Sequence, residues 1–156
     1  RPVVLALSNP TSKSECTLED VARATDGRGL IATGSPFPDL TWNGQTLAAS
    51  QCNNLFVFPG VGLGALVARS PRVTNAMFFA ASRALSALVT PAQERQGLLL
   101  PPMGDIRRVS RAVAKAVAVE ARDAGLGRLL DDQQFEYLVA QAQWLPRYAP
   151  YRPGRI

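Results

Sequence analysis

The sequence predicts an α/β fold built on a parallel sheet, and two observations support this. Short apolar runs alternate with helical patterns over residues 3–69, in the order strand, helix, strand, loop, strand, helix. The first run, Val3 to Leu7, is continuously apolar and β-branched at its start, as in a strand that is covered on both faces. Because three short strands make a small sheet with exposed edges, we expect further strands from upstream residues or from a partner.

The first strand ends in Ser8-Asn9-Pro10. Because the residue before a proline avoids the α region, Asn9 should be extended at the carboxyl end of this strand. Thr17 and Asp20 have the spacing of a capping box, with Asp in place of the more usual Glu. They predict a short helix from Leu18 to Ala24.

Two further strands are predicted before the first long helical region. Leu30 to Thr33 is the second short strand, and the polar connection 37–50 contains a turn signal at Asn43-Gly44. The apolar run Leu55 to Phe58 is interpreted as the third strand. The small apolar residues from Val61 to Arg69 then suit a tightly buried helix.

The C-terminal half of the sequence predicts helices. Residues 75–89 and 105–124 form the two longest patterns, separated by Pro101-Pro102. A final helix is predicted over 132–145, followed by a Pro- and Arg-rich tail over 146–156. In the pattern 105–124, apolar residues recur at helical spacing and should form one buried stripe: Ile106, Val109, Val113, Ala116 and Val117.

The composition excludes several classes of function. The sequence contains no His, which removes Ser-His-Asp and Cys-His nucleophilic sites and His-based zinc sites. The net charge is +5, but aromatic residues do not interleave with the basic group, so we expect a solvated helix face and no nucleic-acid partner. No apolar run approaches the ~20 residues that span a bilayer, so we expect no membrane partner. The basic group comprises Arg107, Arg108, Arg111 and Lys115.

The cysteines, the composition and the first residues suggest the cellular compartment, the source genome and the extent of the chain. Cys16 and Cys52 are far apart and lack metal-ligand spacing, so two thiols in a reducing cytosol are favoured over a disulfide. Arg greatly outnumbers Lys and Ala is abundant, which suggests a GC-rich genome. From the reduced thiols we expect a cytoplasmic protein. The sequence starts without Met and enters a strand pattern at once, so we interpret it as a piece of a longer chain.

A glycine-rich stretch, Gly60 to Ala65, fits the loose dinucleotide-binding pattern G-x-G-x-x-G/A. A working fingerprint also needs an acidic residue about 20 positions later, at the end of the next strand. No acidic residue lies between Asp39 and Glu94, and the segment that should supply the strand is helical. We therefore interpret these glycines as sites where a helix packs closely against a strand.

Three asparagines are better candidates for ligand binding. Asn9 follows the first strand, while Asn53 and Asn54 immediately precede the third apolar run. An Asn side chain offers an acceptor and two donors without charge, so it can recognise a carboxylate, a hydroxyl or a ribose. Ligands of doubly wound sheets bind at the carboxyl ends of strands. Taken alone, each asparagine would more often be a turn or cap residue.

Several longer segments around these residues form a more specific pattern than the glycines. They are, in order, SNPTSKSECT at 8–17, ATGSPF at 32–37, NN at 53–54 with FPGV at 58–61, LLPP at 99–102 and DIR at 105–107. Together they resemble the malic enzymes over nearly the whole chain. The resemblance implies the C-terminal part of a Rossmann-type doubly wound parallel sheet, over residues 1–131. It implies C-terminal helices as well, with residues 132–156 as a final helix and tail.

The resemblance also implies an activity, the oxidative decarboxylation of L-malate to pyruvate and CO2 with reduction of NAD or NADP. Mg²⁺ or Mn²⁺ would be required, because negative charge develops on an enolate oxygen. By this resemblance Asn9, Asn53 and Asn54 bind the substrate. Asn9, Gly34 and Asn54 would line the cofactor site, Gly34 being the weaker assignment. The parent enzyme should form a homo-oligomer.

The resemblance places no catalytic residue and no metal ligand in this chain. The family's catalytic Lys and Tyr, its acidic metal cluster and its glycine-rich fingerprint lie upstream, and neither Lys13 nor Lys115 is at the catalytic position. Cys52 stands where the family often has Gly. Two alternatives remain: a non-catalytic dinucleotide-binding-like interaction module, and a malolactic enzyme of the same family. The segment 59–64 resembles bacterial, NAD-using members, which favours a bacterial origin and NAD.

Overall fold

The computed structural model describes residues 1–146 and 148, and its N-terminal part is a small parallel sheet. The strands are β1 (Val3–Ala6), β2 (Leu30–Thr33) and β5 (Ser50–Gln51), in the spatial order β1-β2-β5. All pairings are parallel, with Val3 opposite Leu30 and Thr33 opposite Gln51. The predicted α/β fold with a parallel sheet is confirmed.

Helix α1 (Leu18–Thr25) connects β1 to β2 and packs against the sheet. Its predicted capping box is present, because the backbone N–H of Asp20 donates to Thr17 Oγ1 at 3.1 Å and that of Thr17 donates to Asp20 Oδ2 at 2.8 Å. Leu18 and Val21 pack against Ile31 in a small core. Cys16, in the segment between β1 and α1, also packs against this core.

The expectation that the first strand is covered on both faces was wrong for this chain. Val3 and Leu5 keep 55% and 56% of their surface exposed, whereas Ala6 is buried. Residues of a strand alternate between its two faces, and only one face of β1 meets α1 and its core. The other face of β1 is uncovered among the described residues.

The polar connection between β2 and the helical region contains an antiparallel hairpin that the sequence analysis did not predict. It consists of β3 (Leu40–Trp42) and β4 (Gln45–Leu47). The predicted turn joins them, with positive φ angles of 48° at Asn43 and 78° at Gly44, as a two-residue hairpin turn requires.

The third strand lies earlier than predicted. It is β5, whereas Leu55 to Phe58 is not a strand: residues Asn54–Phe56 form a 3₁₀ turn and helix α2 runs from Phe58 to Ala68. Pro59 occupies the first turn of α2, where its missing N–H and fixed φ are compatible with a helix. A short apolar run does not distinguish a strand from a helix start by periodicity alone, which explains the error.

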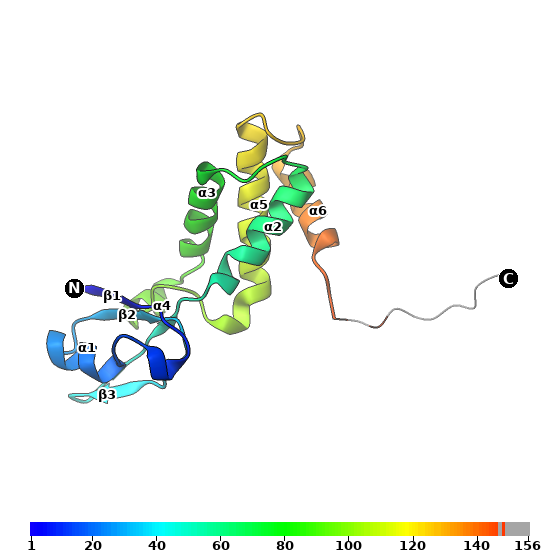
Figure 1. Ribbon diagram of the computed structural model, residues 1–156. Coiled ribbons are helices and arrows are strands. Elements are labelled where there is room, and N and C mark those ends of the chain that lie inside the picture. Colours follow the sequence, from blue (N-terminus) through cyan, green and yellow to red (C-terminus); the bar gives the residue numbers. More distant parts are fainter. Residues whose placement is uncertain (147, 149–156) are drawn as a thin grey trace.

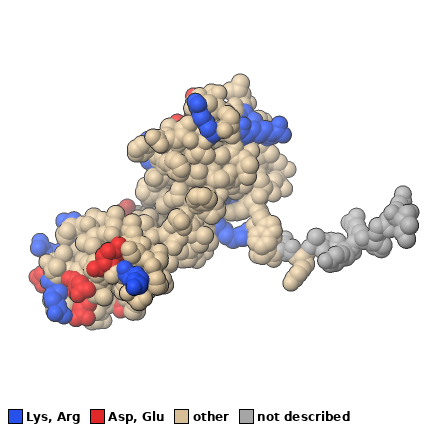
Figure 2. All heavy atoms as spheres, in the orientation of Figure 1, with Lys and Arg blue, Asp and Glu red and all other residues tan. Residues whose placement is uncertain are grey.

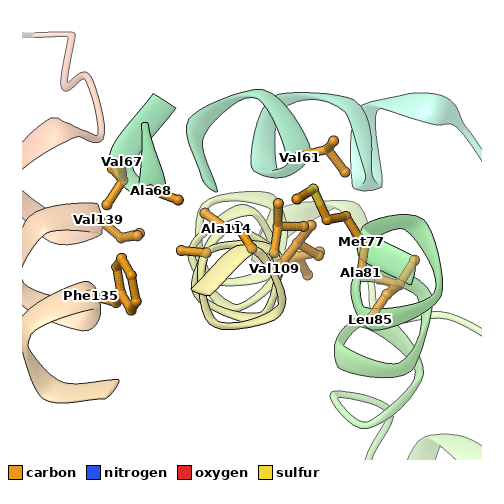
Figure 3. Packing of buried hydrophobic residues seen from close by; sticks show 14 of the residues in the cluster. Val61, Val67, Ala68, Met77, Ala81, Leu85, Val109, Ala114, Phe135 and Val139 are labelled. Carbon is orange, nitrogen blue, oxygen red and sulfur yellow. The ribbon is translucent and has the colours of Figure 1, made fainter. Parts of the chain in front are cut away.

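The C-terminal part is a group of helices around α5 (Figures 1 and 3). Besides α2 and α5 (Ile106–Asp123), it contains α3 (Asn75–Ser86) and α6 (Asp132–Ala142). The short α4 (Pro91–Arg95) lies beside the sheet part in Figure 1. In Figure 3, side chains of α2, α3 and α6 point toward α5 from three sides. Helices α3 and α6 end three residues before their predicted ends.

Helix α5 is more buried than a single stripe predicts. Val109, Val113 and Val117 of the predicted stripe are fully buried, and Ile106 and Ala116 are partly buried. The neighbouring helices also bury residues beside that stripe, which are Ser110, Ala114, Ala118 and Ala121. α5 is therefore the central helix of this part of the fold.

Glycines of α2 let this helix approach α5 closely. A Cβ built on Gly60 would lie 2.7 Å from Cβ of Val113, and one built on Gly64 would lie 2.5 Å from the carbonyl oxygen of Ala114. Gly62 has open space instead. The predicted close packing is confirmed for Gly60 and Gly64, because any larger residue at either position would push the two helices apart. The predicted partner was a strand, and that part was wrong: the element that meets these glycines is helix α5.

Charged residues lie mostly outside this helical core. In the view of Figure 2, acidic and basic side chains gather over the sheet part, and the facing side of the helical part is mainly uncharged.

The predicted basic group lies off the buried side of α5. Three of its members contact α6 or the residues directly after it: Arg107 donates to the Trp144 carbonyl, Arg111 to Gln143, and Lys115 pairs with Glu136. Among residues 1–146 and 148, no helix combines the length and apolarity that a membrane crossing needs.

Candidate functional site

The asparagines and Gly34 come together at the carboxyl edge of the parallel sheet. Asn9 follows β1, Gly34 follows β2, and Asn53 follows β5. Because these strands are adjacent and parallel, the three loops leave the sheet at the same edge. Asn53 and Asn54 were predicted to precede a strand, and that was wrong, because they follow β5. The carboxyl ends of strands are where ligands of such sheets bind.

Asn9 is linked directly to the loop that follows β2. Ser35 Oγ donates a hydrogen bond to Asn9 Oδ1 at 2.5 Å, across 26 positions of sequence. Ser35 is buried, with 8% of its surface exposed, while Asn9 is exposed. The amide oxygen of Asn9 thus already accepts one hydrogen bond, whereas its amide nitrogen donates to no other described side chain or backbone group, so the nitrogen is the end left for a ligand. Ser35 was not identified as a site residue from the sequence, although it lies within the segment ATGSPF.

Gly34 lies where β1 and the loop after β2 converge. Its backbone N–H donates to the carbonyl of Ala6 at 2.9 Å. A Cβ built on Gly34 would overlap the Leu7 carbonyl and would lie 3.0 Å from Asn9 Nδ2. The close approach of the chain after β1 thus requires glycine here, whatever the ligand.

Asn53 and Asn54 differ in what they already contact. The side chain of Asn53 is half-buried, and its Oδ1 accepts from the backbone N–H of Leu55 at 3.0 Å, which caps the 3₁₀ turn. Asn54 is exposed, and its side chain makes no hydrogen bond to another described residue. Asn53, like Asn9, thus has its oxygen engaged and its amide nitrogen left for other partners.

A carboxylate holds the loop that carries Asn9. Ser8 donates to Glu15 twice, from its backbone N–H at 3.2 Å and from its Oγ at 2.7 Å. The hydroxyl bond of Ser8 is the main reason that the pKa of Glu15 lies below its usual range. The sequence showed both residues within one segment, 8–17, but not that they pair.

The third loop is anchored by a serine of β5. Ser50 is buried, and its Oγ accepts from the backbone N–H groups of Leu99 and Leu100, at 2.7 and 3.3 Å. This contact places the segment LLPP at 99–102 against β5, with Pro101 fully buried. That segment therefore has a structural role close to the site.

The chemistry available at this edge is recognition through neutral amides. Amide N–H groups suit a ligand that is rich in acceptor oxygens, such as a carboxylate. Within the described part of the chain, no group of three or more His, Cys, Asp or Glu side chains is placed to hold a metal ion. Cys16 and Cys52 are free thiols, and burial raises the pKa of each, so neither is an activated nucleophile.

Comparison with known proteins identifies the family. Residues 1–122 match the family model described as "Malic enzyme, NAD binding domain". The chain belongs to the malic enzyme family. The malic enzyme resemblance of the sequence is thus confirmed.

Relatives among the malic enzymes cover the chain almost completely. It is 44% identical over 152 residues to the NAD-dependent malic enzyme of Proteus mirabilis and 45% identical to that of Aliivibrio salmonicida. Each alignment covers 97% of this chain and 27% of the relative. The chain therefore spans about a quarter of the length of these malic enzymes.

Solved malic enzyme structures share the fold. The malic enzyme of Entamoeba histolytica superposes with a TM-score of 0.69 at 26% identity, over 90% of this chain and 26% of that protein. The Pyrococcus horikoshii malic enzyme gives a TM-score of 0.66 at 28% identity, over 89% of this chain and 28% of that protein. The Rossmann-type α/β assignment agrees with both.

Proposed function

We propose that this chain is the C-terminal part of the NAD-binding domain of a malic enzyme that oxidatively decarboxylates L-malate to pyruvate and CO2. The observation that carries the proposal is the meeting of Asn9, Gly34 and Asn53 at the ends of three adjacent parallel strands. The named activity of the bacterial relatives supports it. In this assignment residues 1–131 belong to the cofactor domain and residues 132–156 form a C-terminal helix and tail.

The asparagines position the substrate. Asn9, Asn53 and Asn54 orient the malate carboxylate and hydroxyl through their amide groups, and Asn9 and Asn54 also contact the cofactor with Gly34. Two of these amides have their oxygens engaged within the protein, which suits N–H donation to an anionic ligand. Holding a reactant in a reactive geometry removes part of the entropic barrier.

NAD is the cofactor that this site takes, because the relatives are named NAD-dependent. The residues present fit one part of a dinucleotide: exposed amides and a glycine at the carboxyl edge of a parallel sheet. Hydride acceptance is the chemistry that NAD supplies when bound. The role of this chain is to orient the carbon that gives up the hydride.

The divalent cation does not fit the residues of this chain. The described residues offer no acidic cluster, and the site edge carries amides and hydroxyls. We assign Mg²⁺ or Mn²⁺, and the catalytic acid–base groups, to residues outside this chain. The complete enzyme is a bacterial, cytoplasmic homo-oligomer in this proposal, with neither a nucleic-acid nor a membrane partner.

The test is an assay of the full-length protein with L-malate, NAD and Mn²⁺. Malate-dependent formation of NADH with equimolar pyruvate is expected. Lactate without net NADH would instead identify a malolactic enzyme. Absence of any malate turnover would support the interaction-module alternative. The isolated 156-residue chain serves as the control and should be inactive, because it lacks the catalytic groups.

A further inference from the structure

The Asn9–Ser35 hydrogen bond raises the question of which end of the Asn9 amide faces the ligand. A primary amide has an acceptor end and a donor end of nearly the same shape, so a free Asn side chain can present either. In this protein Ser35 Oγ donates to Oδ1 of Asn9 at 2.5 Å. The oxygen is thus turned toward the loop after β2.

The opposite end of the same amide lies beside a glycine. A Cβ on Gly34 would stand 3.0 Å from Asn9 Nδ2, closer than ordinary van der Waals contact. The missing side chain at position 34 thus leaves room next to the amide nitrogen. Consecutive residues of one loop therefore act on the two ends of Asn9: Ser35 holds the oxygen and Gly34 clears space near the nitrogen.

Ser35 itself is poorly placed to meet a ligand. Only 8% of its surface is exposed, whereas Asn9 is exposed. Its hydroxyl hydrogen is used in the bond to Asn9. Any effect of Ser35 on binding should therefore pass through Asn9.

We propose that Ser35 is a positioning residue that fixes the Asn9 amide with its N–H groups toward the ligand, and so selects ligands with an acceptor oxygen, such as a carboxylate. The inference rests on the proposed function, because it takes L-malate as the ligand. Without Ser35, the amide of Asn9 can rotate by a half-turn. In the protein molecules where it has rotated, the amide oxygen faces the oxygens of malate and repels them.

The experiment is a double-mutant cycle in the full-length enzyme, with Ser35→Ala, Asn9→Ala and the double variant. Ser35→Ala should lower kcat/KM for L-malate by about 3- to 10-fold, the range of one ordinary hydrogen bond, mainly through KM. The dissociation constant for L-malate, titrated in the presence of NADH so that no turnover occurs, should rise by a similar factor. The double variant should match Asn9→Ala within about twofold, because Ser35 acts only through Asn9.

Two controls separate positioning from folding. Ser70→Ala removes a serine hydrogen bond of 2.8 Å to the Arg72 carbonyl in a different loop and should leave malate kinetics unchanged. Ser35→Thr keeps the hydroxyl and should recover most of the loss. If Ser35→Thr is unstable, the double-mutant cycle still tests whether Ser35 acts through Asn9, because the cycle uses only alanine variants. The thermal midpoints of these alanine variants show that each of them is folded.

Defined results would overturn the inference. Additive effects of Ser35→Ala and Asn9→Ala, or wild-type kinetics for Ser35→Ala, would show that Ser35 does not act through Asn9. Either result leaves the proposed function intact as long as the wild-type enzyme forms NADH from malate. A wild-type enzyme without malate turnover would overturn the proposed function and this inference together.

Discussion

Gly64 of α2 lies against the backbone of Ala114 in α5, so closely that a Cβ on Gly64 would stand 2.5 Å from the Ala114 carbonyl oxygen. A Cβ on Gly60 would likewise stand 2.7 Å from Cβ of Val113, while one on Gly62 of the same helix would meet open space. The three glycines of one short stretch therefore have different structural roles.

Alanine substitutions should separate those roles. Gly60→Ala and Gly64→Ala should each destabilise the protein by about 1–3 kcal/mol, because the added methyl overpacks the α2–α5 contact. Gly62→Ala should be neutral or stabilise by about 0.5–1 kcal/mol, since alanine restricts the unfolded chain and fits the helix. Denaturant unfolding of the three variants checks this order. Equal effects at positions 62 and 64 would contradict the packing model.

The asparagines should matter for turnover more than for stability. Asn9→Ala or Asn54→Ala in the full-length enzyme should lower kcat/KM for malate by roughly 10²-fold or more, since a polar contact to a charged ligand and its orientation are lost. Asn75→Ala, at an exposed position of α3, is the matched control and should have no effect on kinetics. Near-wild-type kinetics of both site variants would remove these residues from the site.

The hydrogen bonds between Ser8 and Glu15 should make the stability of the folded protein depend on pH in the acid range. Hydrogen bonds from Ser8 hold the folded-state pKa of Glu15 below its ordinary value of 4.5. The stabilisation is therefore present above pH 4.5 and is lost as the pH falls through the folded-state pKa. Glu15→Gln should lower the thermal midpoint at neutral pH, and the difference from wild type should shrink as the pH falls below 4.5, because the protonated Glu15 then resembles Gln. A difference that stays constant with pH would show that the charge of Glu15 is not involved.

The two cysteines should be free thiols that react slowly with alkylating reagents. Burial raises the pKa of Cys52, and burial together with Asp20 and Glu15 raises that of Cys16. Less thiolate is therefore present at neutral pH than in free cysteine, so alkylation by iodoacetamide should be slower than that of glutathione. Both cysteines should be labelled in denaturant without a reductant. Labelling that depends on a reductant would indicate a disulfide.

Helix α6 should be held by its buried residues more than by its surface contacts. Phe135 is fully buried in the helical core, whereas Tyr137 on the same helix keeps 65% of its surface exposed. Phe135→Ala should destabilise the protein by about 3–5 kcal/mol. Tyr137→Ala should change stability by about 0.5 kcal/mol or less. Similar unfolding midpoints for the two variants would contradict the packing of α6 on α5.

The sequence by itself determined the features that depend on neighbouring residues. The capping box of Thr17 and Asp20 and the turn at Asn43-Gly44 are formed by residues at most three positions apart. The buried valines of α5 follow from helical periodicity. The ordered segments shared with malic enzymes also determined the family, because residue identity alone carries them.

Only the tertiary structure decided which residues lie together at the candidate site. β5 has two residues, too few for a periodic pattern, and its existence depends on pairing with β2. The Ser35–Asn9 bond joins residues 26 positions apart, and the Gly64–Ala114 contact joins two helices. Such contacts depend on how distant segments meet in space, which local propensity and spacing do not specify. The sequence therefore predicted the asparagines as candidate site residues, and the tertiary structure determined that the oxygens of the Asn9 and Asn53 amides accept hydrogen bonds from Ser35 and Leu55.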